Sequence, residues 1–209
     1  MEKFSIKKHF KNEIDEIWND INFQGIEFLE RGYAMQDEII KNSILFIGIN
    51  PSFSGKHLKN ESHFYNNTQE GKIYSYFKKF QDLSKKTNVP WSHLDLLYLR
   101  ETNQKNVQRI NSHQTGKVFV RKQLQLSKRI IEKSQPKIIV VSNAFARNLL
   151  NLDFKIEFDE NFGTHKIIEN LELENTPVFF TSMLTGQRAL DLGSYERLIW
   201  HLKFVLSKI

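Results

Sequence analysis

Four short apolar segments alternate along the chain with amphipathic stretches, and they are residues 44–49, 93–98, 137–142 and 177–182. Apolar runs bounded by turn residues are typical of strands that are buried on both faces of a parallel sheet. Because helical patterns separate these strands, the sequence predicts helices on both faces of one sheet. We therefore predict an α/β fold, a three-layer α/β/α sandwich with a central four-stranded parallel sheet.

Apolar residues repeat at helical spacing in the other segments, which are residues 14–28, 73–83, 120–131, 144–150 and 195–206. Pro136 is expected to end the basic helix, and Ser194 is expected to cap the last helix. Residues 155–175 are expected to form a hairpin. Since no repeat and no Pro- or Gly-rich linker divides the chain, we predict a single domain over residues 1–209 with an N-terminal helical extension at about residues 1–40.

The composition is that of a folded protein without thiol chemistry. Of the 209 residues, 40% are hydrophobic and 12% are aromatic, which excludes a disordered chain. The absence of cysteine excludes disulfides, thiolate nucleophiles, cysteine-bound zinc and iron–sulfur clusters. The seven histidines show no metal-binding spacing, so each is expected in a loop or on the surface. We expect no cofactor and no metal.

No apolar run follows Met1, and no segment approaches the length needed to cross a membrane. We therefore expect a cytoplasmic protein that does not bind membranes, and we expect it to be monomeric.

The charge distribution favours a polyanionic partner, which we expect to be DNA. The net charge is +6, with a pI of about 9.3. Residues 117–137 hold seven basic side chains against Glu132 alone, whereas residues 153–175 hold seven acidic side chains against two lysines. A chain with separated basic and acidic regions presents one side to phosphate groups.

The residues that follow the predicted strands are the candidates for chemistry. Asn50 comes directly after an apolar run, and Pro51 stiffens the turn and favours an extended backbone at Asn50. In open α/β sheets, ligands bind outside the carboxyl ends of the strands. An ordinary strand-to-loop turn is the alternative. A phosphate-binding loop at residues 48–56 is excluded, because six residues separate its glycines and His57 follows Lys56.

Three strand ends together resemble one protein family. Residues 47–52 read Ile-Gly-Ile-Asn-Pro-Ser, residues 136–147 read Pro-Lys-Ile-Ile-Val-Val-Ser-Asn-Ala-Phe-Ala-Arg, and residues 179–188 read Phe-Phe-Thr-Ser-Met-Leu-Thr-Gly-Gln-Arg. In order and spacing they resemble the uracil-DNA glycosylase superfamily, in its mismatch-specific and single-strand-selective branches, over roughly residues 40–208. The resemblance implies the fold of that family and excision of a damaged or mismatched base, uracil or a related one, from DNA. It also implies that Asn50 orients the attacking water.

The same resemblance implies roles for other residues. Phe64 would stack on the extruded base, with Phe53 as the second choice, and a core position is the alternative for either ring. Asp95 would read the edge of the base, or it has a surface or capping role. Asn143 would line the pocket or cap the next helix.

The final loop departs from the family because the usual histidine is missing, with Phe180 or Thr181 near its place. Ser182, Thr185, Gln187 or backbone N–H groups would then supply the hydrogen bond to the leaving base, or the glycosylase activity is weak or lost. Arg188 would contact phosphates.

Leu184 would fill the gap that the extruded base leaves in the duplex, and the alternative is that it packs in the core. Two other functions remain open for the chain: a catalytically silent protein of this fold that binds nucleic acid or a flipped base, and a hydrolase of small nucleosides.

Overall fold

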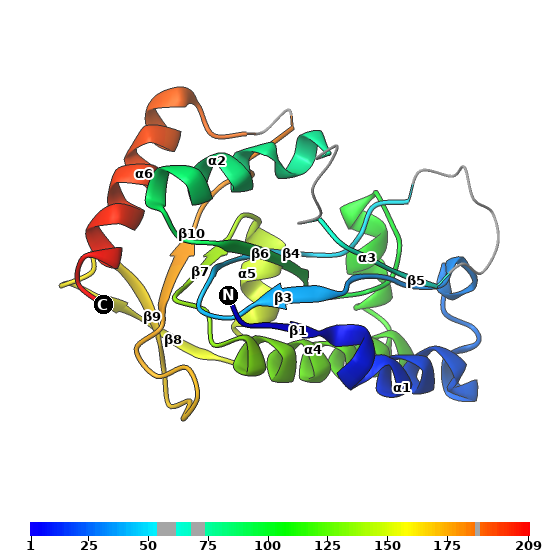
Figure 1. Ribbon diagram of the computed structural model, residues 1–209. Coiled ribbons are helices and arrows are strands. Elements are labelled where there is room, and N and C mark those ends of the chain that lie inside the picture. The colour runs from blue at the N-terminus through cyan, green and yellow to red at the C-terminus, as the bar shows by residue number, and fades with distance from the viewer. Residues whose placement is uncertain (54–61, 68–73, 187–188) are drawn as a thin grey trace.

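A mixed sheet with the strand order β6-β4-β7-β10-β9-β8 forms the centre of the protein (Figure 1). The computed structural model describes residues 1–53, 62–67, 74–186 and 189–209. The strands of this sheet are β4 (Ile44–Gly48), β6 (Trp91–Asp95), β7 (Ile138–Val141), β8 (Lys155–Asp159), β9 (Thr164–Ile168) and β10 (Pro177–Phe180). Neighbours among β6, β4, β7 and β10 are parallel, whereas β9 is antiparallel to both β10 and β8.

The α/β class predicted from the sequence is confirmed, but the sheet is larger than expected. The hairpin expected at residues 155–175 does form, and its second strand pairs with the edge of β10 through Val178 and His165. The hairpin thereby adds β9 and β8 and makes a six-stranded mixed sheet. An edge strand has unpaired N–H and C=O groups, and the hairpin satisfies those of β10.

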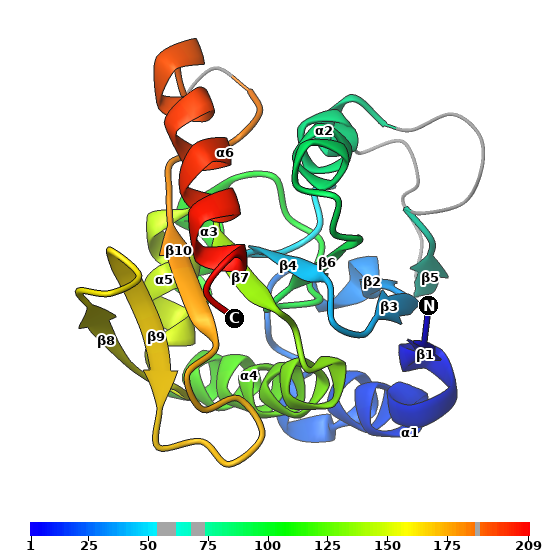
Figure 2. The same cartoon turned by 60° about the vertical axis from the view of Figure 1, so that its left-hand side comes forward.

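Helices cover both faces of the sheet (Figure 2). The buried side chains form two hydrophobic clusters. One cluster includes residues of α1 (Ile6–Asn19), α3 (Gln104–Ile110), α4 (Gln114–Ser134) and α5 (Ala144–Leu150). The other includes residues of α2 (Lys78–Thr87) and α6 (Leu192–Leu206). Side chains alternate along a strand, so Leu45 and Ile47 of β4 pack in the first cluster while Ile44 and Phe46 pack in the second. Continuous apolar strands are therefore buried on both sides.

The N-terminal region differs from the helical extension that the sequence predicts. The first helix ends at Asn19 rather than near Phe28, because the Asp20 side chain accepts the N–H of Asn22 and starts the short 3-10 helix Ile21–Phe23. Four short strands form two pairs around it. β1 (Lys3–Ser5) pairs with β3 (Glu38–Ile40), and β2 (Ala34–Gln36) pairs with β5 (His63–Tyr65). Two further 3-10 helices span Leu29–Arg31 and Ser75–Phe77.

Two boundaries also move. The second core strand lies at Trp91–Asp95 rather than at residues 93–98. The backbone N–H groups of Leu96 and Leu97 donate to the carbonyls of Gly48 and Ile49. In a strand only every second residue bonds to the same neighbour, so two successive bonds mark the end of the strand. The cap of α6 is Asp191, whose carboxylate accepts the N–H of Ser194 at 2.9 Å. No helix in the described part of the chain is long and apolar enough to cross a membrane.

Candidate active site

The carboxyl ends of β4 and β6 lie side by side and carry two of the predicted site residues. Gly48 is opposite Asp95 in the parallel register, and Asn50 follows β4 by two residues. Because side chains alternate along a strand, Asp95 lies on the same sheet face as His93 and Trp91, whose rings pack against Phe80 of α2. The candidate site is therefore at the carboxyl edge of the sheet, on the side that α2 and α6 cover.

The side-chain amide of Asn50 is held in one orientation. Its Nδ2 donates to the carbonyl oxygens of Glu101 at 2.6 Å, Pro51 at 2.9 Å and Leu99 at 3.3 Å. Only the NH₂ end of a carboxamide donates to a carbonyl, so these contacts determine which end is which. The Oδ1 atom of this half-buried side chain has no partner among the described residues. It is a fixed acceptor, as needed to orient a water molecule.

Glu101 fixes the loop that holds Asn50. Its side chain is 7% exposed, and its Oε1 accepts the N–H of Asn103 at 2.7 Å. Its Oε2 accepts from Arg31 at 3.0 Å and from Asn106 at 3.2 Å. Burial raises the pKa of this carboxyl group, but these hydrogen bonds outweigh burial and the pKa is lowered. Glu101 is thus a stable anion that keeps its own carbonyl next to Asn50.

Phe53, the second of the predicted stacking rings, lies beside two cations. The guanidinium carbon of Arg31 is 4.4 Å from the centroid of its ring, and that of Arg100 is 5.2 Å away. Thr102 Oγ1 accepts the N–H of Phe53 at 3.0 Å and donates to its carbonyl at 2.7 Å. The ring is therefore positioned by the same loop that positions Asn50, and its stacking on a substrate stays a prediction.

Asp95 is a buried carboxyl group with a perturbed pKa. Its side chain is 11% exposed, and burial raises its pKa to about 7. Gly48 makes room for it, because a Cβ atom at Gly48 would lie 2.1 Å from Asp95 Oδ1. The glycine of the first motif is thus required by a close approach across the two strands. Near neutral pH, Asp95 changes between a hydrogen-bond donor and an anion.

His93 contradicts the expectation that every histidine lies in a loop or on the surface. It is 3% exposed in the middle of β6, and its Nε2 is 3.6 Å from Asp95 Oδ1. Its ring stacks on Phe80, with 5.8 Å between the ring centroids. Neither ring nitrogen has a hydrogen-bond partner within residues 1–53, 62–67, 74–186 and 189–209. Burial lowers its pKa to about 3, so the imidazole is neutral.

Two tyrosines lie near Asp95. Burial, and after it the charge of Asp95, raise the pKa values of Tyr65 and Tyr76. The centroid of the Tyr76 ring is 5.9 Å from that of His93, and Tyr76 is 38% exposed. Tyr76 is therefore the more exposed of these two rings, since Tyr65 is half-buried.

Phe64 does not share this position. It precedes Tyr65 on β5, so its side chain points to the opposite face of that strand. Its ring packs edge-on against Tyr33 at 5.7 Å between centroids and against the core cluster that includes α1. The core alternative thus holds for Phe64, and Tyr65 and Tyr76 are the aromatic side chains beside Asp95.

Asn143 has the capping role that was one of its two alternatives. Its Oδ1 accepts the N–H groups of Phe145 at 2.7 Å and Ala146 at 3.3 Å, at the start of α5. Its Nδ2 donates to Gln104 at 3.2 Å. Both ends of the amide are therefore used inside the protein. Ser182, two residues beyond β10, is exposed, and its hydroxyl has no hydrogen bond to a described residue.

Leu184 belongs to the core. It is 3% exposed and packs in the cluster that α2 and α6 share, so it is not available to enter a DNA duplex in this structure. Its neighbour Met183, 36% exposed, is the apolar side chain that the loop presents. Gln187 and Arg188, the other two predicted residues of this loop, lie outside the described residues.

Burial of Leu184 predicts the effect of its removal. We expect Leu184→Ala to lower the free energy of unfolding by roughly 2–5 kcal/mol, because the truncation leaves a cavity. Chemical denaturation measures this loss, and Met183→Ala is the matched exposed control, expected to change stability by less than about 1 kcal/mol. A fully stable Leu184→Ala variant that binds duplex more weakly than single strands would instead restore the wedge role.

Half of the six basic side chains of helix α4 are paired with acidic side chains of other elements. Its ion pairs join Arg121 to Asp153, Lys122 to Asp20, and Arg129 to Glu13. The helix also ends at the amino edge of the sheet, where the carbonyl of Gln135 accepts the N–H of Asn42. Its last cations, Arg129 and Lys133, therefore lie at the end of the sheet opposite Asn50. The sequence predicted a phosphate-binding face here, and these contacts do not support it.

The described residues contain no group of three or more His, Asp or Glu side chains that could hold a metal ion. Comparison with protein-family models gives no match, and comparison with curated proteins gives none either. The site must therefore be interpreted from its own geometry.

Sequence reasoning missed Glu101, His93, Tyr65 and Tyr76. A signal for His93 was present, because strand alternation in the segment His-Leu-Asp puts His93 and Asp95 on one face. No local pattern marks Glu101, since its role depends on contacts with Asn50 and Arg31, which are distant in sequence.

Proposed function

We propose that the chain is a hydrolase of N-glycosidic bonds that excises uracil or a related base from DNA, with the three-layer fold of the uracil-DNA glycosylase superfamily. The observation that carries the proposal is the amide of Asn50, whose Nδ2 is held by three carbonyls and whose Oδ1 is left as a fixed acceptor. The parallel strand order β6-β4-β7-β10 and the helices on both faces support it further. We expect the protein to act as a monomer in the cytoplasm.

In this proposal, Asn50 Oδ1 accepts a hydrogen bond from a water molecule whose oxygen attacks C1′ of the deoxyribose. The bond between C1′ and the base nitrogen breaks, and the base leaves with the electron pair of that bond. The water loses a proton, which neutralises the departing base or passes to solvent. An amide is not a strong base, so Asn50 acts by orientation, and the reaction should be slower than with a carboxylate in its place.

Asp95 takes the place of the histidine that the final loop lacks, as the hydrogen-bond donor to the leaving base. When protonated, its carboxyl group donates a hydrogen bond to a carbonyl oxygen of the base, where negative charge develops as the base leaves. Its pKa of about 7 allows the protonated form at and below neutral pH. Tyr76 is the accessible ring for stacking on the extruded base, next to Asp95.

A second candidate is hydrolysis of free nucleosides. The observation that favours it is helix α4, where Arg121, Lys122 and Arg129 are paired with acidic side chains and whose end lies away from Asn50. A small uncharged nucleoside needs no phosphate-binding surface, whereas a DNA strand does.

One experiment separates these functions. Labelled single strands and duplexes that carry uracil, hypoxanthine or a mismatch are incubated with the protein and treated with alkali, and free deoxyuridine and deoxyinosine are assayed in parallel for base release. Alkali-dependent strand breaks support the DNA glycosylase. Base release from nucleosides alone supports the second candidate. Binding without cleavage identifies a silent binding protein, and neither binding nor cleavage rejects the proposal.

A further inference from the structure

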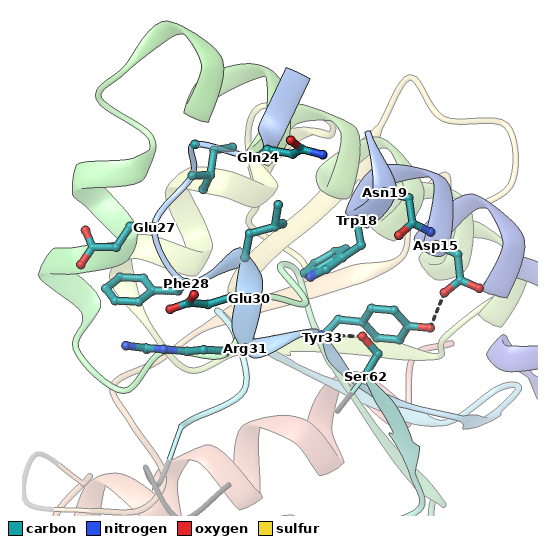
Figure 3. A pocket seen from close by; sticks show the side chains of 13 residues that line it. Asp15, Trp18, Asn19, Gln24, Glu27, Phe28, Glu30, Arg31, Tyr33 and Ser62 are labelled. Atoms are coloured by element: carbon teal, nitrogen blue, oxygen red, sulfur yellow. Dashed lines mark hydrogen bonds between the residues drawn. The ribbon is translucent and has the colours of Figure 1, made fainter. Parts of the chain in front are cut away.

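A pocket separate from the strand ends lies between α1 and the segment of residues 24–31 (Figure 3). Its volume is about 790 Å³, within the range of roughly 300–1,000 Å³ that small-molecule sites occupy. Three aromatic side chains line it, from Trp18, Phe28 and Tyr33. None of the residues proposed for N-glycosidic hydrolysis lines it.

Trp18 lines this pocket and carries a buried hydrogen-bond donor that no described residue uses. Its Nε1 is buried and has no partner in the part of the chain that the structure describes. The ring is held edge-on by Tyr33 and Phe119, with centroid distances of 5.2 and 5.3 Å. Figure 3 shows the nitrogen edge of the indole on the side where Phe28, Glu30 and Arg31 lie. A buried donor without a partner costs about 1–3 kcal/mol, so an acceptor on a ligand would satisfy it.

Phe28 is held in a strained conformation at the wall of the pocket. Its φ angle is 73°, in the left-handed region that an aromatic residue rarely adopts. The guanidinium carbon of Arg31 lies 3.7 Å from the centroid of its ring. Backbone strain of this kind persists where the surrounding structure requires it, and it is enriched in ligand sites. Phe28 and Arg31 both line the pocket, and aromatic rings and guanidinium planes are the surfaces on which nucleobases stack.

The charges of the pocket select against anions. The carboxylates of Asp15, Glu27 and Glu30 line it, against the single cation Arg31. Asp15 accepts from Tyr33, Glu27 pairs with Arg109, and Arg31 pairs with Glu101. Glu30 is exposed and has neither a hydrogen bond nor an ion pair with a described residue. Its carboxylate is the free acceptor of the pocket, and a phosphate group would be repelled there.

We propose that this pocket binds an uncharged guanine base or guanosine, with Trp18 as donor and Glu30 as acceptor. The neighbouring N1–H and N2–H groups of guanine match the two oxygens of one carboxylate, and its O6 and N7 atoms are acceptors for an indole N–H. The proposal goes beyond excision at Asn50 and does not depend on it.

Titration calorimetry with guanosine, GMP and cytidine tests the proposal. Guanosine is expected to bind, and GMP and cytidine are expected to bind about tenfold more weakly or worse, because of the added phosphate and the missing pair of donors. Trp18→Phe keeps a ring and removes the N–H, and Glu30→Gln keeps the shape and removes one acceptor. Each should weaken guanosine binding by about tenfold. Glu16→Gln, exposed on α1 and outside the pocket, is the matched control and should leave the affinity unchanged.

Other outcomes overturn the assignment. Absence of guanosine binding up to its solubility limit rejects it, and so does equal binding of guanosine and GMP. Binding of tetramethylammonium without guanosine would make the pocket a site for organic cations. Thermal melting of each variant verifies folding, and Glu30→Gln, at an exposed position, keeps the test decisive if Trp18→Phe is unstable.

Discussion

Asn50→Ala is expected to lower base excision by at least about 100-fold, which corresponds to roughly 2.7 kcal/mol of transition-state stabilisation. The loss follows because alanine has no acceptor in place of Oδ1, so the attacking water is no longer oriented. Single-turnover cleavage of the best substrate from the excision assay measures it. Activity retained within a factor of about two would mean that Asn50 only holds the loop.

The same substitution also affects stability. A position in a turn predicts little cost from sequence alone, but Nδ2 donates to the carbonyls of Glu101, Pro51 and Leu99. Their loss should cost about 1–3 kcal/mol. Asn143→Ala is the matched control, because it removes another strand-end asparagine whose role is to cap α5. It should cost about 0.5–2 kcal/mol of stability and leave the rate of excision unchanged.

The elements that the sequence predicts best are the strands buried on both faces of the sheet. Residues 44–48 and 138–141 are fully apolar up to a glycine or a turn, so their strands could be predicted without tertiary information. The three-residue strands of the N-terminal region are too short for any period to appear. Their pairing depends on distant partners, such as Lys3 with Ile40.

In the candidate site, too, local features could be predicted from the sequence, whereas features that depend on distant contacts could not. The position of Asn50 at a strand end followed from sequence, because the apolar run stops just before it. The orientation of its amide did not, since two of its three acceptors, Leu99 and Glu101, lie about fifty residues further along the chain. The wedge role of Leu184 failed for a related reason. A leucine among small polar residues looks exposed in the sequence, and only the packing of α2 and α6 shows that it is buried.

Asp95→Asn is expected to stabilise the protein relative to the unchanged chain by an amount that grows with pH. Burial raises the pKa of Asp95 from 3.8 to about 7, so between these values the unfolded chain is ionised and the folded one holds a proton. The folded state therefore loses stability as pH rises through this window, and the loss is complete above about pH 7. The shift corresponds to about 4 kcal/mol. Asparagine does not titrate, so the difference in unfolding free energy should increase from pH 4 to pH 7 and then stay constant.

The neighbours of Asp95 do not obscure this slope. His93 is neutral in the folded state above about pH 3. Its effect on the unfolding free energy is present both in the unchanged chain and in Asp95→Asn, so to first order it cancels when the two values are subtracted. The pKa values of Tyr65 and Tyr76 are raised further above the range of the experiment. Asp82→Asn is the control of opposite sign, because a hydrogen bond from Tyr195 lowers the pKa of Asp82. Its destabilising effect should be full at neutral pH and fade in acid. A pH-independent difference for Asp95→Asn would show that folding does not raise the pKa of Asp95, so that its carboxyl group is ionised at neutral pH. Its role as a hydrogen-bond donor to the leaving base would then fail, because only the protonated carboxyl group can donate.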